Sequence, residues 1–475
     1  MGSLTKIVVF LYVTSAVLCT PFINQLQPGQ EWPKRNSVKQ PNAEESLDLT
    51  NEVVTETGDA AEFDKAALEE PEPTLGKSGK VDYTGCQVWK VSTAKAGAKA
   101  VINKLSSDKL IASWGGSESS IDVLIKPKVI ENVTTVLRSK DIPYSIMIED
   151  LQQRINEENP PLDENEIELQ DRRGHRMTWK QYHRVEDIHG FMNYLAETYP
   201  SIISVNTIGK SHEGRDLKVL RISDGKSTNK AVFIDGGIHA REWISPAVVT
   251  YLINQFAENF DVETDDIKNI DWYFLPVVNP DGYEYTHNTD RMWRKNRKRY
   301  GIGFCYGTDL NRNFGYHWGG KGASINPCSE IYRGEAAFSE PESKAISDFF
   351  ATTATKFTAY LTYHSYGQYL LYPWGYDNTL PPDYKELQSV GEEIAESIRK
   401  AGGSEYTVGS SSGLLYSAAG GSDDWAKSLG IKYTYTIELS DTGRHGFVLP
   451  ASYIKPVAKE NLAGLRVLAQ KVNEA

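Results

Sequence analysis

Residues 231–242 read Ala-Val-Phe-Ile-Asp-Gly-Gly-Ile-His-Ala-Arg-Glu, and this stretch decides the fold. A short apolar run that ends in two glycines is typical of a buried strand that leads into a tight turn. His239 and Glu242 follow the turn, separated only by Ala240 and Arg241. Histidine nitrogens and carboxylate oxygens are both zinc ligands in proteins. The stretch therefore predicts a buried strand whose carboxyl end is followed by two metal-binding side chains.

A second β-rich run, Phe357 to Tyr363, ends directly before His364. Open α/β sheets place their sites at the carboxyl ends of strands. A His and a Glu at this spacing occur by chance in many chains. Metal-binding residue types that follow two separate strands are less easily explained by chance. A set of two His and one Glu leaves one zinc position open, as catalytic sites do. We therefore expect one zinc ion, bound by His239, Glu242 and His364.

Strand-like and helix-like runs alternate through the rest of residues 177–475. Strands are expected at Leu217–Ile222, Ala231–Asp235, Trp272–Val278, Phe357–His364 and Tyr433–Leu439. Helices are expected near Val185–Thr198, Pro246–Asn259, Pro341–Ala354, Tyr384–Ala401 and Ile454–Lys471. This alternation predicts an α/β fold with a mixed, mainly parallel sheet and helices on both of its faces.

The N-terminal part of the chain has a different composition. Lys6 and the apolar run Ile7 to Leu18 predict a secretory signal peptide over residues 1–20, and the run is too short to span a membrane. Residues 21–80 are acidic and poor in aromatic residues, so we expect a disordered extension. A solvated tail is favoured over a specific binding function for this segment.

Residues 81–173 predict a small domain of their own, an α/β open sandwich. Its strands are expected at Cys86–Val91, Ile121–Ile125 and Tyr144–Ile148, and its helices at Ala94–Leu105 and Pro127–Leu137. An acidic segment follows, and then the basic residues Arg172, Arg173 and Arg176. Basic residues in an exposed linker between two domain-sized blocks favour cleavage by a trypsin-like protease.

Several further motifs make the chain similar to a known family. They are HAREW (239–243), MWRK (292–295), DLNRN (309–313), His364 to Tyr366, YSAAGGSDDW (416–425) and TIELSDTGRHGF (436–447). With these motifs the chain resembles the secreted zinc metallocarboxypeptidases of the pancreatic A/B type, which are made as zymogens. The resemblance covers nearly all of residues 180–475, and a looser one covers about Tyr83 to Arg173. It implies that residues 81–173 are an activation prodomain and residues 174–475 a zinc carboxypeptidase domain.

The resemblance also implies roles for individual residues. Asp309 matches the residue that hydrogen-bonds to a ligand His. Glu438 matches the general base, which takes a proton from the zinc-bound water and passes it to the leaving amine. Arg294 matches the donor to the oxyanion. The positions that match substrate-binding residues are Arg241, Asn311, Arg312, Tyr366, Tyr416, Asp423 and Phe447. Arg312 and Asn311 match the pair that grips the terminal carboxylate, for which the planar guanidinium is suited.

Asp423 matches the position that sets specificity. An Asp there implies B-type removal of a C-terminal Lys or Arg, because a buried carboxylate needs a cationic partner. Gly375 departs from the small hydroxyl residue that basic-specific members tend to carry in this pocket. Two alternatives are an A-type enzyme that prefers hydrophobic C-terminal residues and a pseudoenzyme that only binds peptides. The complete set of ligands, base and oxyanion donor argues against the pseudoenzyme.

Cysteines and charge set further bounds. A bridge between Cys305 and Cys328 would close a long loop, and the resemblance implies the same pair, whereas Cys86 is expected to be a small buried apolar residue. The net charge is −12, and no Lys/Arg cluster suggests nucleic acid or an anionic membrane as a partner. We expect a secreted, extracellular monomer, with the digestive lumen a plausible setting. Its partners would be peptide or protein C-termini and an activating trypsin-like protease.

Overall fold

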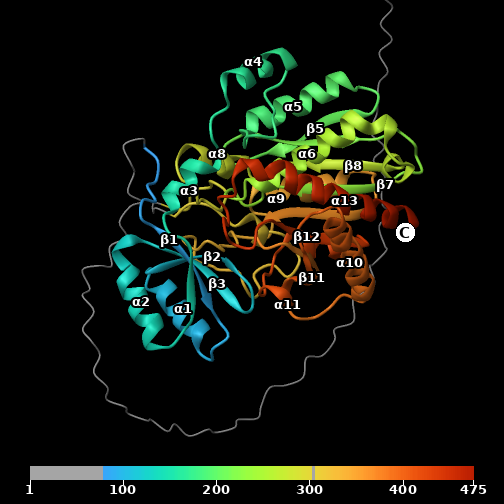
Figure 1. Cartoon of the computed structure of the whole chain (residues 1–475). Coiled ribbons are helices and arrows are strands. Elements are labelled where there is room, and N and C mark those ends of the chain that lie inside the picture. Colours follow the sequence, from blue (N-terminus) through green and yellow to red (C-terminus); the bar gives the residue numbers. More distant parts are fainter. Residues whose placement is uncertain (1–78, 302–304) are drawn as a thin grey trace, which may run out of the picture. The chain divides into compact units, whose positions relative to one another are not determined.

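The computed structural model of the chain describes residues 79–301 and 305–475 (Figure 1). The expected signal peptide and nearly all of the acidic extension lie outside the described residues. Within them, a small N-terminal domain precedes a larger α/β domain. Each domain is built around its own sheet.

The N-terminal domain has a four-stranded antiparallel sheet in the order β2-β3-β1-β4. Its strands are β1 (Gln87–Ser92), β2 (Ile111–Gly116), β3 (Ser120–Ile125) and β4 (Tyr144–Ile148). Its helices are α1 (Ala98–Ser107) and α2 (Ile130–Ser139), and the short 3₁₀ helix η2 (Pro127–Val129) leads into α2. The sequence analysis did not predict β2, because its two glycines and a bulge interrupt the regular alternation of a strand.

The two faces of this small sheet have different partners. Trp89 and Val91 on β1 belong to a core shared with α1 and α2. Val88, which directly precedes Trp89 and lies on the opposite face, packs in a second cluster with Met292 and Phe447 of the larger domain. Because alternate residues of a strand point to opposite faces, one strand serves both the core of its own domain and the contact with the next.

The connection between the domains is helical, a feature for which the sequence analysis made no prediction. It contains α3 (Leu151–Glu158) and α4 (Glu164–Arg173). The side chain of Asp163 caps α4 by accepting a hydrogen bond from the Glu166 N–H. Gly174 ends the helix with a φ of 75°, a left-handed conformation that favours glycine. Arg172 and Arg173 therefore lie in the last turn of a helix.

The larger domain has an eight-stranded sheet in the order β11-β10-β12-β9-β7-β8-β6-β5. The four strands β12, β9, β7 and β8 at its centre are parallel, and antiparallel pairs lie toward both edges. The strands are β5 (Ile203–Lys210), β6 (Asp216–Ile222), β7 (Lys230–Gly236), β8 (Ile270–Leu275), β9 (Phe357–Ser365), β10 (Tyr369–Tyr372), β11 (Thr407–Ser410) and β12 (Tyr433–Leu439). The predicted mixed, mainly parallel sheet is confirmed.

Helices cover both faces of this sheet (Figure 1). On β7, Val232 and Ile234 pack in one core with the long helices α5, α6, α10 and α13, whereas Ala231 and Phe233 pack in another with α9 and α12. The bounds of these helices are α5 Val185–Thr198, α6 Ile244–Asn259, α9 Pro341–Thr352, α10 Tyr384–Lys400, α12 Ser422–Ser428 and α13 Ile454–Glu474. Shorter helices are α7 (Asp265–Lys268), α8 (Pro280–Asn288), α11 (Ser411–Leu414), η3 (Phe260–Val262), η4 (Leu310–Arg312) and η5 (Ala451–Tyr453).

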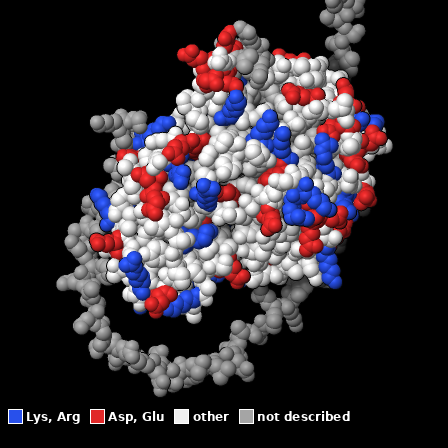
Figure 2. Space-filling view, viewed as in Figure 1, with Lys and Arg blue, Asp and Glu red and all other residues white. Residues whose placement is uncertain are grey.

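The strands that the sequence analysis missed lie at the sheet edges or are very short. β5 carries polar residues on both faces, and β10 and β11 have four residues each. Among the described residues, no helix has the length and apolar character needed to cross a membrane. On the face shown in Figure 2, Lys and Arg side chains are interspersed with Asp and Glu.

Candidate active site

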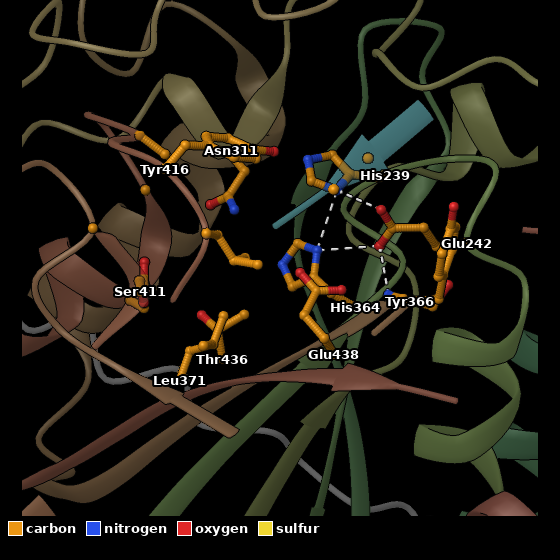
Figure 3. Close-up of a pocket in the computed structure, with 18 of the residues that line it drawn as sticks. His239, Glu242, Asn311, His364, Tyr366, Leu371, Ser411, Tyr416, Thr436 and Glu438 are labelled. Atoms are coloured by element: carbon orange, nitrogen blue, oxygen red, sulfur yellow. Dashed lines mark hydrogen bonds and ion pairs between the residues drawn. The ribbon is translucent and has the colours of Figure 1, made fainter. Parts of the chain in front are cut away.

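Three side chains expected to bind zinc meet at the carboxyl ends of β7 and β9 (Figure 3). His239 Nδ1 lies 2.8 Å from Glu242 Oε1, and His364 Nδ1 lies 3.1 Å from both His239 Nδ1 and Glu242 Oε2. All three residues are buried. Two imidazole nitrogens and a carboxylate that converge at these separations match the ligand set and the size of a four-coordinate zinc site.

The turn after β7 places the first two of these residues. A Cβ at Gly236 or Gly237 would lie 2.8 Å from Ser245 Oγ or Pro246 Cγ, respectively, at the start of α6. Gly237 also has a φ of 65° and donates its N–H to Ser245 Oγ. Only glycine fits such close packing with this backbone conformation. The glycine pair therefore lets the chain reverse tightly and present His239 and Glu242 beside the strand end.

Both imidazoles are oriented by groups behind them. His239 Nε2 lies 3.1 Å from Asp309 Oδ1. His364 Nε2 lies 3.3 Å from Thr362 Oγ1, whose hydroxyl donates to Asp235. Each Nε2–H thus has an acceptor, which leaves the Nδ1 lone pair of each ring directed toward the ligand cluster. Thr362 and Asp235 were not singled out by sequence reasoning, although the alternation of β9 places Thr362 on the same face as His364.

The pKa values of His239, Glu242 and His364 are shifted by burial and by neighbouring charges. Burial lowers the pKa of His239. Burial also disfavours the charged form of His364, but hydrogen bonding and attraction to Glu242 outweigh it and raise its pKa to about 9. Burial opposes ionisation of Glu242, yet the two imidazoles hold its pKa well below its usual range. The two imidazoles therefore favour the ionised form of Glu242, which is the form that a carboxylate ligand of a metal ion needs.

Glu438 lies beside the ligands, opposite His364 in the pairing of β12 with β9. Burial raises the pKa of its carboxyl to about 8, and the nearby charge of Glu242 adds to the effect while His364 opposes it. Among the described residues, only burial and nearby charges, and no hydrogen bond, contribute to this shift. The carboxyl group faces the pocket (Figure 3), where a cation or a water molecule would be its partner.

Arg294 is held against Asp309. Its Nη2 and Nε donate to Asp309 Oδ2 at 2.8 and 3.2 Å. Burial works against the charge of Arg294, but the neighbouring carboxylates, with Asp309 first among them, raise its pKa. Asp309 is itself fully buried, and the cationic Arg294 and Arg312 hold its pKa well below its usual range despite that burial. Asp309 thus fixes both a ligand imidazole and the guanidinium that lines the same pocket.

The residues predicted to bind the substrate's terminal carboxylate, Asn311 and Arg312, lie on η4, and Tyr416 lies at the pocket rim. Arg312 donates to the carbonyls of Gly322 and Asn311, and Asn311 Oδ1 accepts the N–H of Ser422. These bonds fix the loop that carries both residues, and both side chains line the pocket. Tyr416, which is 49% exposed, lies at the rim.

Asp423 lines the pocket from the first turn of α12. It is buried, and Ser411 Oγ lies 3.3 Å from its Oδ2. The neighbouring Asp424 accepts the backbone N–H groups of Gly375 and Tyr376. Of these two neighbouring carboxylates, Asp424 is engaged by the backbone and Asp423 lines the pocket.

The N-terminal domain closes part of this pocket. Trp114, Gly115 and Gly116 at the end of β2 contribute to its lining. Tyr366 donates its hydroxyl to Asp122 Oδ2 at 2.6 Å, and Lys90 forms an ion pair with the same carboxylate at 2.9 Å. A substrate would compete with these residues for the same space.

Arg241 and Phe447 meet the same domain, but only Phe447 lines the pocket. The Arg241 guanidinium lies 4.2 Å from the centre of the Phe447 ring and donates to the Trp114 carbonyl at 3.4 Å. Farther out, Arg291 forms a buried ion pair with Glu158 of α3. In this state, Arg241 is therefore engaged by the N-terminal domain and is not directed into the pocket.

Sequence reasoning missed part of the lining. These residues are Trp114, Gly115, Gly116, Ser365, Leu371, Ser411, Leu415, Ala418, Gly421 and Thr436. Strand alternation carried a signal for Thr436, which lies two positions before Glu438 on β12. No local pattern pointed to Ser411 or to the residues of the N-terminal domain, because they reach the pocket only through tertiary contacts.

The cysteines are placed as expected. A disulfide joins Cys305 to Cys328, with 4.8 Å between their Cα atoms. Cys86 is a buried free thiol, and burial raises its pKa to about 11. A thiol with a raised pKa is unreactive, which is consistent with a packing role.

Comparison with known proteins identifies relatives of both parts of the chain. Residues 188–464 match the family model described as zinc carboxypeptidase, and residues 89–158 match the carboxypeptidase activation peptide. Carboxypeptidase B of Astacus astacus is 44% identical over 63% of this chain and 99% of the relative. Carboxypeptidase A2 of Mus musculus is 40% identical over 73% of this chain and 82% of the relative. The crystal structure of thrombin activatable fibrinolysis inhibitor superimposes with a TM-score of 0.74 and 35% identity, over 82% of this chain and 98% of that one.

Proposed function

Because the chain belongs to the zinc carboxypeptidase family, with an activation peptide before its enzyme domain, we propose that it removes single C-terminal Arg and Lys residues from peptides. The enzyme is a zinc metallocarboxypeptidase, and relatives of both the A and the B type are similar to it. The observation that carries the B-type proposal is the buried carboxylate of Asp423 in the lining of the pocket.

The electrostatics of the pocket support a cationic side chain. The pKa values of Asp235, Asp424 and Glu438 are all raised, chiefly by burial, and the negative charge of Asp423 contributes to each shift. A buried carboxylate beside other acidic groups is costly unless a cation offsets its charge. An ammonium or guanidinium group beside Asp423 would relieve this repulsion, whereas a phenyl ring would leave the carboxylate desolvated and unpaired.

The substrate would lie between Arg312 and the ligand cluster. In this arrangement Arg312 and Asn311 bind the terminal carboxylate, since a planar guanidinium donates two parallel hydrogen bonds to it. Tyr416 and Phe447 bound the space at the rim. This places the scissile carbonyl next to His239, Glu242 and His364, and directs the C-terminal side chain toward Asp423.

His239, Glu242 and His364 are the proposed zinc ligands, with Asp309 and Thr362 as their orienting partners. Bound zinc acts as a Lewis acid and lowers the pKa of water to about 7. Glu438 takes a proton from the attacking water and delivers it to the leaving amine. Arg294 donates hydrogen bonds to the carbonyl oxygen as negative charge develops there.

The N-terminal domain would keep the uncleaved chain latent, because Trp114, Gly115 and Gly116 occupy the pocket lining. We place the activating cut at Arg172, Arg173 or Arg176, with residues 81–173 as the prodomain and 174–475 as the enzyme. The Arg176 side chain is 74% exposed, as a cleavage site for a trypsin-like protease requires. A signal peptide over residues 1–20 would export the zymogen, which would act outside the cell as a monomer.

One experiment separates the B-type proposal from the A-type alternative. The trypsin-treated protein is assayed on peptides that differ only in a C-terminal Arg, Lys, Phe or Leu, and kcat/KM is measured for each. The proposal expects the values for Arg and Lys to exceed those for Phe and Leu by at least ~10²-fold, the scale of leaving a buried charge unpaired. A value for Phe equal to or above that for Arg would establish the A-type alternative.

A further inference from the structure

The small N-terminal domain carries a motif that the proposed activity does not use. Residues 132–134 read Asn-Val-Thr, which is an acceptor triplet for N-linked glycosylation, because its third residue is Thr or Ser and its second is not Pro. It is the only such triplet in the 475-residue sequence. Triplets of this kind also arise by chance, so the place of this one in the fold decides whether it can carry a glycan.

The acceptor asparagine lies on the solvent side of α2. Asn132 is exposed, whereas the next residue, Val133, is buried and packs with Leu137 in the core that α2 shares with Trp89 and Val91. An N-linked glycan is bulky and solvated, so it can be attached only to a side chain that reaches solvent. Asn132 meets this requirement, and Val133 and Leu137 hold the opposite side of the helix against the sheet.

Helix α2 covers the face of the small sheet that does not contact the enzyme domain. Trp89 belongs to the core on the α2 side, whereas Val88, one residue earlier on the same strand, packs with Met292 and Phe447. Neighbouring residues of a strand point to opposite faces of the sheet. A glycan on Asn132 would therefore not lie between the two domains, and the N-terminal domain could still close the pocket.

The folded helix separates the two side chains of the triplet that the glycosylating enzyme recognises together. Asn132 is exposed and Thr134 is half-buried, and residues two apart on a helix do not face each other. The helix is closed at this point, because the neighbouring Thr135 donates its hydroxyl to the Glu131 carbonyl at 2.9 Å. The chain would therefore have to be modified before α2 folds, while it is being exported.

We propose that Asn132 carries an N-linked glycan in the exported zymogen, an inference that rests on the proposed export of this chain. The Asn132 amide nitrogen attacks the anomeric carbon of a lipid-linked oligosaccharide. A C–N bond forms, the bond from that carbon to the lipid diphosphate oxygen breaks, and the nitrogen gives up one proton. Residues 174–475 contain no such triplet. The activating cut would therefore separate a glycosylated prodomain from an enzyme without an N-linked glycan.

The test expresses the full-length chain in a eukaryotic cell line and weighs the secreted protein by mass spectrometry before and after treatment with an N-glycanase. The wild-type protein should lose the mass of one glycan, and the treated peptide should be deamidated at residue 132. Asn132→Gln and Thr134→Ala should lose no mass. Thr134→Ser keeps the triplet and should keep the glycan. Thr135→Ala is the matched control, because it removes the adjacent hydroxyl outside the triplet, and it should also keep the glycan.

Activation with trypsin checks that the variants fold. Wild type and Asn132→Gln should yield enzymes of equal kcat/KM, because Asn132 lies away from the contact between the domains, and the glycan should be found only on the N-terminal fragment. A secreted wild-type chain that loses no mass, or a loss that persists in Asn132→Gln, would overturn this inference alone. A chain that stays in the cytosol would overturn it together with the proposed export.

Discussion

Glu438 and His364 are register partners in the parallel pair β12–β9, and both side chains point to the same pocket. The hydrogen-bond ladder of the central sheet therefore sets the distance between the proposed general base and a proposed zinc ligand. A strand is stiffer than a loop, so this pair is held in place without the prodomain or a substrate. The first prediction follows from this arrangement.

Replacing Glu438 with Gln should leave zinc and peptide binding intact and reduce kcat at least ~10²-fold, the scale of a lost general base. Gln has the same shape but cannot accept and return a proton. Stopped-flow turnover of an Arg-ending peptide, with zinc measured by mass spectrometry, checks this. A variant with wild-type kcat would require another group to act as the base.

Zinc affinity should rise with pH and displace about one proton per ion bound. The pKa of His364 is raised to about 9, so in the metal-free protein its imidazolium competes with zinc at any lower pH, and the competition fades as pH rises through 9. His239 and Glu242 have lowered pKa values and bring no further proton. Titration with a zinc chelator between pH 6 and 9 measures the slope. His364→Ala should bind far less than one zinc per chain, and full occupancy in this variant would remove His364 from the ligand set.

Cleavage with trypsin should convert a nearly inactive zymogen into active enzyme. The new N-terminus, read by sequencing, should follow Arg172, Arg173 or Arg176. In the uncut protein, Trp114→Ala should raise activity, because the residue that lines the pocket from β2 is shortened. Trp318→Ala offers a control, since that indole is not among the residues that line the pocket and contacts Arg333. Equal activity before and after cleavage would contradict latency.

Replacing Asp423 with Ile should transfer preference from Arg and Lys to aliphatic and aromatic C-terminal residues. The substitution removes the buried charge that pairs with the cation and makes this part of the pocket apolar. Zinc content should not change, because Asp423 is not among the ligand atoms that converge at His239, Glu242 and His364. Ratios of kcat/KM for Arg- and Phe-ending peptides report the switch. An unaltered ratio would show that Asp423 does not read the side chain.

The local pattern of apolar residues was enough to predict the central strands of the larger sheet and its long helices. The apolar runs that became β7, β9 and β12 were visible in the sequence, and so were the residues at their carboxyl ends. A buried parallel strand must be apolar along its length, so it is conspicuous in a sequence. The helices α5, α10 and α13 were equally visible, because each buries one face in a large core, and α6 was visible as a long apolar run that is buried on nearly all sides.

The sequence by itself determined which residues could form the metal cluster, its base and the pocket carboxylate. Only the tertiary structure decided what surrounds them: Thr362 and Asp235 behind His364, Ser411 beside Asp423, and Trp114 in the pocket. It also turned Arg241 toward the N-terminal domain and made the connection before Gly174 helical. The physical reason is that ligand types and strand periodicity are local properties of the chain. Contacts between segments far apart in sequence depend on how the sheets and helices pack, which no local pattern encodes.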